Sequence, residues 1–164
     1  MNATHFHLLL NHFPIIGTLI GTIIIIYGFI INDIKIKILS AYIITAMTLI
    51  AVPVYLTGEP AEETVEKIKG ISENNIELHE DAAEFAIVLM SITAVIALIS
   101  IIVSKQKPEL AHKTFFVLII FSFFSFAAMA RVGYLGGKIR HTELNSNVSQ
   151  KAPANGIEAH EEED

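Results

Sequence analysis

The sequence contains no cysteine and no tryptophan among its 164 residues. The absence of cysteine excludes a disulfide framework, thiolate metal sites, iron–sulfur clusters and a cysteine nucleophile. Charged residues are also scarce, at 17% of the chain, and no basic run points to nucleic acid as a partner. The formal net charge of −6 indicates little about partners, because the acidic residues concentrate in one loop and in the C-terminal tail.

Apolar residues, in contrast, are abundant: they make up 52% of the chain and give a mean hydropathy of +0.56. Four apolar segments, nearly free of charge, cover residues 12–31, 38–57, 85–103 and 114–133. Each is close to the ~20 residues with which a helix crosses a hydrocarbon core of ~30 Å. A soluble four-helix protein would need polar faces that these segments lack. We therefore predict an all-α fold, a four-helix transmembrane bundle in the lipid bilayer.

The predicted bundle occupies residues 1–144, and residues 145–164 form an acidic tail that we expect to be disordered. The first apolar segment is too long for a signal-peptide core and no Lys or Arg precedes it, so we expect it to remain in the mature protein. A short amphipathic helix is expected in the second loop. Pro60 suits its first turn, apolar residues recur after it at helical spacing, and Gly70 ends the run.

The distribution of lysine predicts how the bundle is oriented. The first and third loops carry Lys35, Lys37, Lys105, Lys107 and Lys113. Short loops rich in Lys and Arg face the cytoplasm. We therefore expect a bacterial inner (cytoplasmic) membrane protein with both termini and the second loop on the outer, periplasmic side.

Five histidines gather at the outer ends of the predicted spans. The first helix contributes His5, His7 and His12, the third contributes His79 and the fourth contributes His141. At ~1.5 Å per residue, His79 and His141 stand roughly 9 and 12 Å beyond the apolar boundary. His5 and His7 reach a similar height, whereas His12 lies near the hydrocarbon edge.

Helix phase restricts which histidines of the first helix can face the bundle. His5 and His12 are seven residues apart and share a face, whereas His7 points nearly opposite to His5. At most two of the three can therefore face inward in a regular helix. Pro14 removes one backbone donor and can kink this turn, so the choice among the three stays open.

Imidazole is a common metal ligand and the axial ligand of b-type haem. A bis-histidine haem would need two imidazoles on opposite sides of a slot, and glycines could line such a slot: Gly17, Gly21, Gly133, Gly136 and Gly137. Arg131 could pair with a haem propionate. A transition-metal ion would instead need three or four ligands, from these histidines together with Glu80 or Glu84.

Each of these features also has a purely structural interpretation. Gly17 and Gly21 form a small-xxx-small pair that is typical of helix packing in membranes. Single histidines can be polar anchors at the interface. Arg131 can pair with Glu84 or Glu59 and hold the bundle together. The coincidence of several imidazoles at one height, from three helices, is what favours a site.

Short motifs in the chain resemble an uncharacterised family of small bacterial four-span proteins. The matching pieces are His12-Phe13-Pro14-Ile15 in the first helix, His79-Glu80 opening the third, and Gly136-Gly137 followed by His141 at the end of the fourth. The resemblance implies the four-span fold and marks His12, His79 and His141 as the residues of interest. It implies no settled activity, although some relatives look fused or adjacent to redox proteins.

The sequence contains no Walker loop, nucleophile elbow or dinucleotide fingerprint, and His79-Glu80 lacks the second histidine of a zincin motif. We therefore expect a binding or electron-transfer protein rather than an enzyme. The leading hypothesis is a membrane protein that binds haem b for electron transfer, with a redox partner or a larger respiratory complex. The alternatives are a membrane protein that binds or senses a small metal ion, and a non-catalytic structural subunit. A homo-oligomer is possible in each case.

Overall fold

The computed structural model describes residues 3–65 and 73–140, and the regular structure in these ranges is entirely helical. Six helices follow one another: α1 (Ala3–Leu10), α2 (His12–Ile30), α3 (Ile34–Leu56), α4 (Gly58–Val65), α5 (Glu73–Gln106) and α6 (Pro108–Arg140). Four runs are long and apolar enough to cross a membrane: Thr4–Ile30, Ile34–Leu56, Glu73–Gln106 and Pro108–Ile139. The predicted all-α, four-helix fold is confirmed, and the second loop contains a short helix, α4, as expected. The predicted end of that helix at Gly70 lies outside the described residues. The predicted tail, 145–164, lies outside the described residues.

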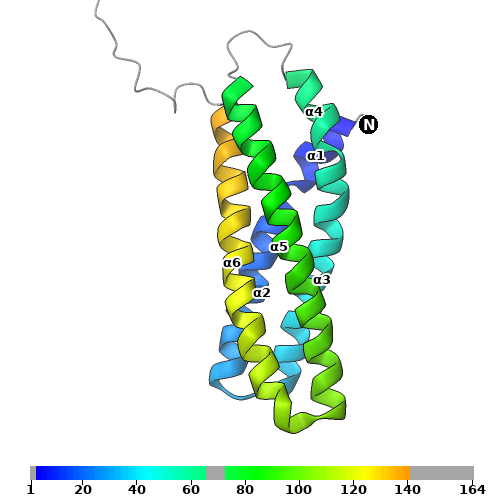
Figure 1. Ribbon diagram of the computed structural model, residues 1–164, viewed down its shortest axis with the longest axis vertical. Coiled ribbons are helices and arrows are strands. Elements are labelled where there is room, and N and C mark those ends of the chain that lie inside the picture. The colour runs from blue at the N-terminus through cyan, green and yellow to red at the C-terminus, as the bar shows by residue number, and fades with distance from the viewer. Residues whose placement is uncertain (1–2, 66–72, 141–164) are drawn as a thin grey trace, which may run out of the picture.

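Helices α2, α3, α5 and α6 form a closed four-helix bundle (Figure 1). α2 packs on α3, α3 on α5, α5 on α6, and α6 returns to α2. The end that carries α1, α4, the start of α5 and the close of α6 is called the histidine end, because His7 and His79 lie there. The opposite end holds the α2–α3 and α5–α6 connections. It is called the lysine end, after Lys107 between α5 and α6 and the lysines near the adjoining helix ends: Lys35, Lys37, Lys105 and Lys113.

The α2–α3 connection shows how local chemistry closes the bundle at the lysine end. Asn32 adopts a left-handed φ of 54°, and Asp33 N–H donates to the Gly28 carbonyl at 2.9 Å, which ends α2 in a Schellman motif. The Asp33 carboxylate then caps α3 by accepting from the backbone N–H groups of Lys35 at 2.7 Å and Ile36 at 3.2 Å. The two helices therefore reverse direction within three residues and lie in close contact.

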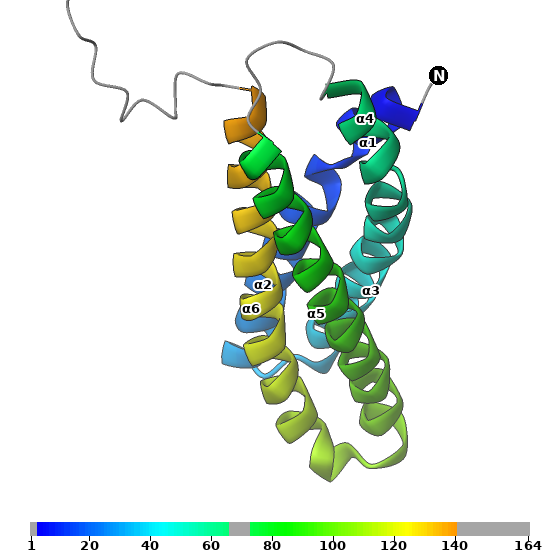
Figure 2. The same ribbon diagram turned by 45° about the horizontal axis from the view of Figure 1, so that its top comes forward.

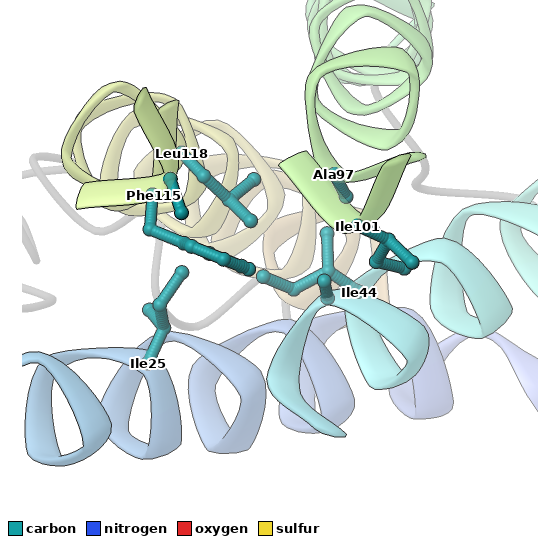
Figure 3. Close-up of a cluster of buried hydrophobic side chains, with 8 residues drawn as sticks. Ile25, Ile44, Ala97, Ile101, Phe115 and Leu118 are labelled. Atoms are coloured by element: carbon teal, nitrogen blue, oxygen red, sulfur yellow. The ribbon is translucent and has the colours of Figure 1, made fainter. Parts of the chain in front are cut away.

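A cluster of buried side chains joins all four long helices near the lysine end (Figure 3). Ile25 of α2, Ile44 of α3, Ala97 of α5 and Phe115 of α6 are at most 1% exposed. Small residues and hydroxyl groups complete the interior, as is typical where helices pack without a hydrophobic driving force between them. Ser40, for example, donates to the Gly21 carbonyl of α2 at 2.7 Å.

The outward surface of the bundle is apolar, which decides its environment. Leu49, Val95 and Phe123, in the middle of α3, α5 and α6, are each more than half exposed. Water does not favour such a surface, whereas lipid does, and the helices satisfy their own backbone hydrogen bonds. The protein is therefore a multi-pass membrane protein whose immediate partner is the lipid bilayer.

Candidate functional site

The position of the first histidines follows from a break between α1 and α2. Pro14 has no backbone N–H, so it cannot donate to the carbonyl of Leu10 one turn earlier, and the helix is interrupted at Asn11. The Asn11 backbone keeps helical dihedral angles (φ −59°, ψ −26°) and its N–H donates to the His7 carbonyl at 2.9 Å, so the interruption is a kink and not a loop. α1 then packs against α4 and α3 (Figure 2). The kink that Pro14 was expected to allow thus turns α1 toward α4 and the end of α3.

His7 is half-buried between α1 and the end of α3. Its Nδ1 lies 2.9 Å from the carbonyl oxygen of Val54. That carbonyl lacks a helical donor because α3 ends at Leu56, and the Thr57 hydroxyl also donates to it, at 3.0 Å. A carbonyl only accepts, so Nδ1 carries the proton and the Nε2 lone pair of the neutral ring is unused by this bond.

His79 is half-buried between α5 and α6 and is held in the same way. Its Nδ1 donates to the carbonyl oxygen of Val132 at 3.0 Å. The imidazole lies against Gly136, where an added Cβ would come within 3.1 Å of its Cε1 atom. The absence of a side chain at Gly136 therefore allows the ring to approach α6, and Nε2 again carries the free lone pair.

The environment of His79 favours the neutral imidazole. The residue stands in the polar first part of α5, outside the apolar residues 85–103. Burial lowers the pKa of His79 below its ordinary value, the bond to Val132 opposes this shift, and a charge on His7 adds to it. At neutral pH the His79 ring is available as a ligand.

Of the imidazoles predicted to lie at one height, the structure shows His7 and His79 half-buried, and the layer as a whole stays a prediction. His5 and His12 are exposed, and His141 lies outside the described residues. Within residues 3–65 and 73–140, no three His, Asp or Glu side chains are grouped so that they could hold a metal ion. Helix phase agrees with the difference in exposure within α1, because His5 and His7 are two residues apart and point to different sides of the helix, and His7 is the half-buried one.

The glycines that were predicted to line a haem slot face different neighbours in the structure. Gly17 and Gly21 face α3, where a Cβ would collide with the side chains of Met47 and Ile44, so they serve close helix packing. Gly136 holds the His79 ring, as described above. Nothing lies within 4 Å of the position that a Cβ on Gly137 would take.

Arg131 is exposed on α6. Among the residues that the structure describes, it forms no salt bridge with Glu84 or Glu59, the partners considered from the sequence. Its side chain instead lines a groove between α5 and α6.

Three polar groups at this end were not predicted from the sequence. Two are the backbone carbonyls of Val54 and Val132, which every residue type carries and which no motif can mark. The third is the side-chain oxygen of Asn11, one turn after His7, which is buried without a hydrogen-bond partner in the described part of the chain. A buried acceptor of this kind costs free energy unless water or a bound group pairs with it.

Comparison with known proteins adds no relative: no family model matches the chain, and no significant match is found among curated proteins or solved structures. The resemblance to a four-span bacterial family therefore remains a prediction from short motifs. The chain is a multi-pass membrane protein whose histidine end carries a pair of tethered, half-buried imidazoles.

Proposed function

We propose that this membrane protein binds haem b at its histidine end, with His7 and His79 as the axial ligands, and that it serves in electron transfer. The observation that carries the proposal is the matched tethering of the two rings. Each Nδ1–H donates to a backbone carbonyl of another helix, at 2.9 and 3.0 Å, which leaves each Nε2 lone pair for iron. Histidines that bind metals are commonly oriented by this kind of second hydrogen bond.

The number of ligands favours haem over a small ion. A b-type haem needs two axial imidazoles because the macrocycle supplies the other four ligands. A zinc-like site needs three or four protein ligands, and the described residues bring no such group together.

When bound, haem would supply reversible one-electron chemistry, and the chain would supply the ligands, their orientation and a partly buried setting that tunes the potential. A redox partner protein, or a larger respiratory complex, would then approach the histidine end, where α1 and α4 border the site.

The test is an absorption spectrum of the protein purified in detergent after expression with a supply of haem. We expect a Soret band and, on reduction, the sharp visible bands of low-spin haem with two axial ligands. His7→Ala and His79→Ala should each abolish haem binding or convert the haem to a high-spin form. His5→Ala and His12→Ala are matched controls, because both histidines belong to the same part of the chain as His7 and both are exposed. They should leave the spectrum unchanged.

A folded protein that lacks a Soret band would overturn the proposal, as would haem whose spectrum is insensitive to both His7→Ala and His79→Ala. Stoichiometric iron, copper or zinc without haem would support the small-ion alternative. Unimpaired assembly with partner subunits, after all four of these histidines are replaced, would support a structural role.

A further inference from the structure

A groove of about 370 Å³ lies between α5 and α6 on the lipid-facing surface, and neither His7 nor His79 is among the residues that line it. Phe85 and Phe124 form its sides and are each more than half exposed. Ala127 and Ala128 are small residues of the same lining and leave the space between the rings open. The groove is therefore an apolar channel along the outside of the bundle that lipid can enter.

A single charged group, Arg131, lines this groove at the end nearer to the histidines. In the described ranges no carboxylate forms an ion pair with it, and it is exposed. Asp81 lies on α5 one turn before Phe85, toward the histidine end, and it is also exposed. An unpaired guanidinium beside lipid is costly unless an anion pairs with it.

The length of the groove relates this cation to the membrane. Arg131 stands ten residues beyond Phe121, another lining residue, which corresponds to ~15 Å along the helix. That is about half of a ~30 Å hydrocarbon core, or one leaflet. Beyond Arg131 on the same side of α6, Lys138 lies over the Tyr134 ring at 4.8 Å, a basic and aromatic pair typical of the membrane interface. Counted from Phe121, the Arg131 backbone lies about one leaflet away, and the long side chain can extend its guanidinium further toward the headgroups.

Because the groove combines an apolar lining with one cation at its end, we propose that it binds one anionic phospholipid of the leaflet at the histidine end. An acyl chain lies along Phe121, Phe124 and Phe85, over the two alanines, and the headgroup phosphate pairs with Arg131. The charge of Arg131 selects anionic over zwitterionic headgroups, because the guanidinium has no competing partner among the described carboxylates. The proposal does not depend on haem binding, since neither His7 nor His79 lines the groove.

The test measures which lipid the protein retains. The full chain is placed in nanodiscs that contain equal amounts of phosphatidylglycerol and phosphatidylcholine with the same acyl chains, and bound lipids are counted by native mass spectrometry. We expect retention of one phosphatidylglycerol. Arg131→Gln should reduce the preference for it about fivefold, the ratio expected from ~1 kcal/mol per basic residue near a charged surface. Lys113→Gln removes the same charge from the same helix at the lysine end, and should leave the preference unchanged.

A second variant tests whether the space in the groove is needed while Arg131 is left unchanged. Ala127 is exposed, so Ala127→Leu should fold normally while it fills the groove and displaces the acyl chain. Helical content by circular dichroism verifies folding of each variant. Equal retention of the two lipids by the unmodified protein would overturn the proposal. An equal loss of preference in Arg131→Gln and Lys113→Gln would do so as well, since it would indicate general charge attraction. A lipid-free dimer that Ala127→Leu disrupts would show that a second copy, and not lipid, covers the groove.

Discussion

At the scale of single residues, the glycines of this chain differ in what surrounds them. A Cβ on Gly28 would lie 2.8 Å from Ile36 Cγ2 and 3.0 Å from the backbone nitrogen of Lys37, so α2 and α3 touch there through their backbones. Gly137 on α6 has no atom within 4 Å of that position. The same residue type is therefore required at one site and replaceable at the other.

We expect Gly28→Ala to lower the free energy of unfolding by about 1–3 kcal/mol, because a backbone contact cannot move aside as a side chain can. Gly137→Ala is the matched control: it should leave stability unchanged or raise it by up to ~1 kcal/mol, because alanine favours the helix. Thermal unfolding followed by circular dichroism in one detergent compares the two. Equal stability of Gly28→Ala and the unmodified protein would show that the tight α2–α3 contact is not needed.

The histidines show what the sequence predicts at this scale and what it leaves open. Helix phase separates His7 from His5 and His12, because seven residues complete nearly two turns, and in the structure His7 is half-buried whereas the other two are exposed. The sequence could not identify which of the three faces inward, because Pro14 permits a kink whose direction depends on how α1 packs against α3 and α4. The carbonyls of Val54 and Val132, which orient the two rings, have no sequence signature at all.

At the scale of helices, α5 and α6 are joined by a buried pair of hydroxyl groups. The Oγ1 of Thr93 and the Oγ of Ser125 are 2.7 Å apart, and Thr93 also donates to the Leu89 carbonyl of its own helix at 2.8 Å. Ser125 therefore donates to Thr93 across the interface. Such bonds between membrane helices contribute ~0.6 kcal/mol on average and at most ~1.7 kcal/mol.

A double-mutant cycle of Thr93→Val and Ser125→Ala should give a coupling energy of about 0.5–1.5 kcal/mol in unfolding measured by steric trapping or denaturant. Thr45→Val and Ser91→Ala form the control cycle, because each hydroxyl donates to a carbonyl of its own helix, Ala41 and Ile87 respectively. That cycle should show no coupling. If the first cycle is also additive, the hydroxyl pair does not hold α5 against α6.

At the scale of the whole molecule, the number of spans was predictable because apolar content alone determines it. The helices nevertheless extend beyond the apolar segments: α5 begins at Glu73, well before residue 85, and α6 begins at Pro108. These polar extensions carry His79 and Glu109 and depend on contacts between helices, which hydropathy does not encode. The lysine loops meet at one end, as the antiparallel order of the helices requires.

The orientation of this bundle in the membrane is the last prediction, and the absence of cysteine makes it simple to test. The lysine-rich loops are expected in the cytoplasm, so the histidine end should face outward. Glu80→Cys and Lys105→Cys place single thiols on exposed residues at the two ends. A membrane-impermeant maleimide applied to intact bacterial spheroplasts should label Glu80→Cys alone, and lysis should expose both variants.

The unmodified chain is the control for this labelling, since it has no thiol to react. Lys105→Cys removes one loop lysine but leaves Lys107 and Lys113, so the charge difference between the two ends keeps its sign. The opposite labelling pattern would place His7 and His79 on the cytoplasmic side. It would also change the electron-transfer proposal itself, because the redox partner that reaches the histidine end would then be a cytoplasmic protein and not a periplasmic one.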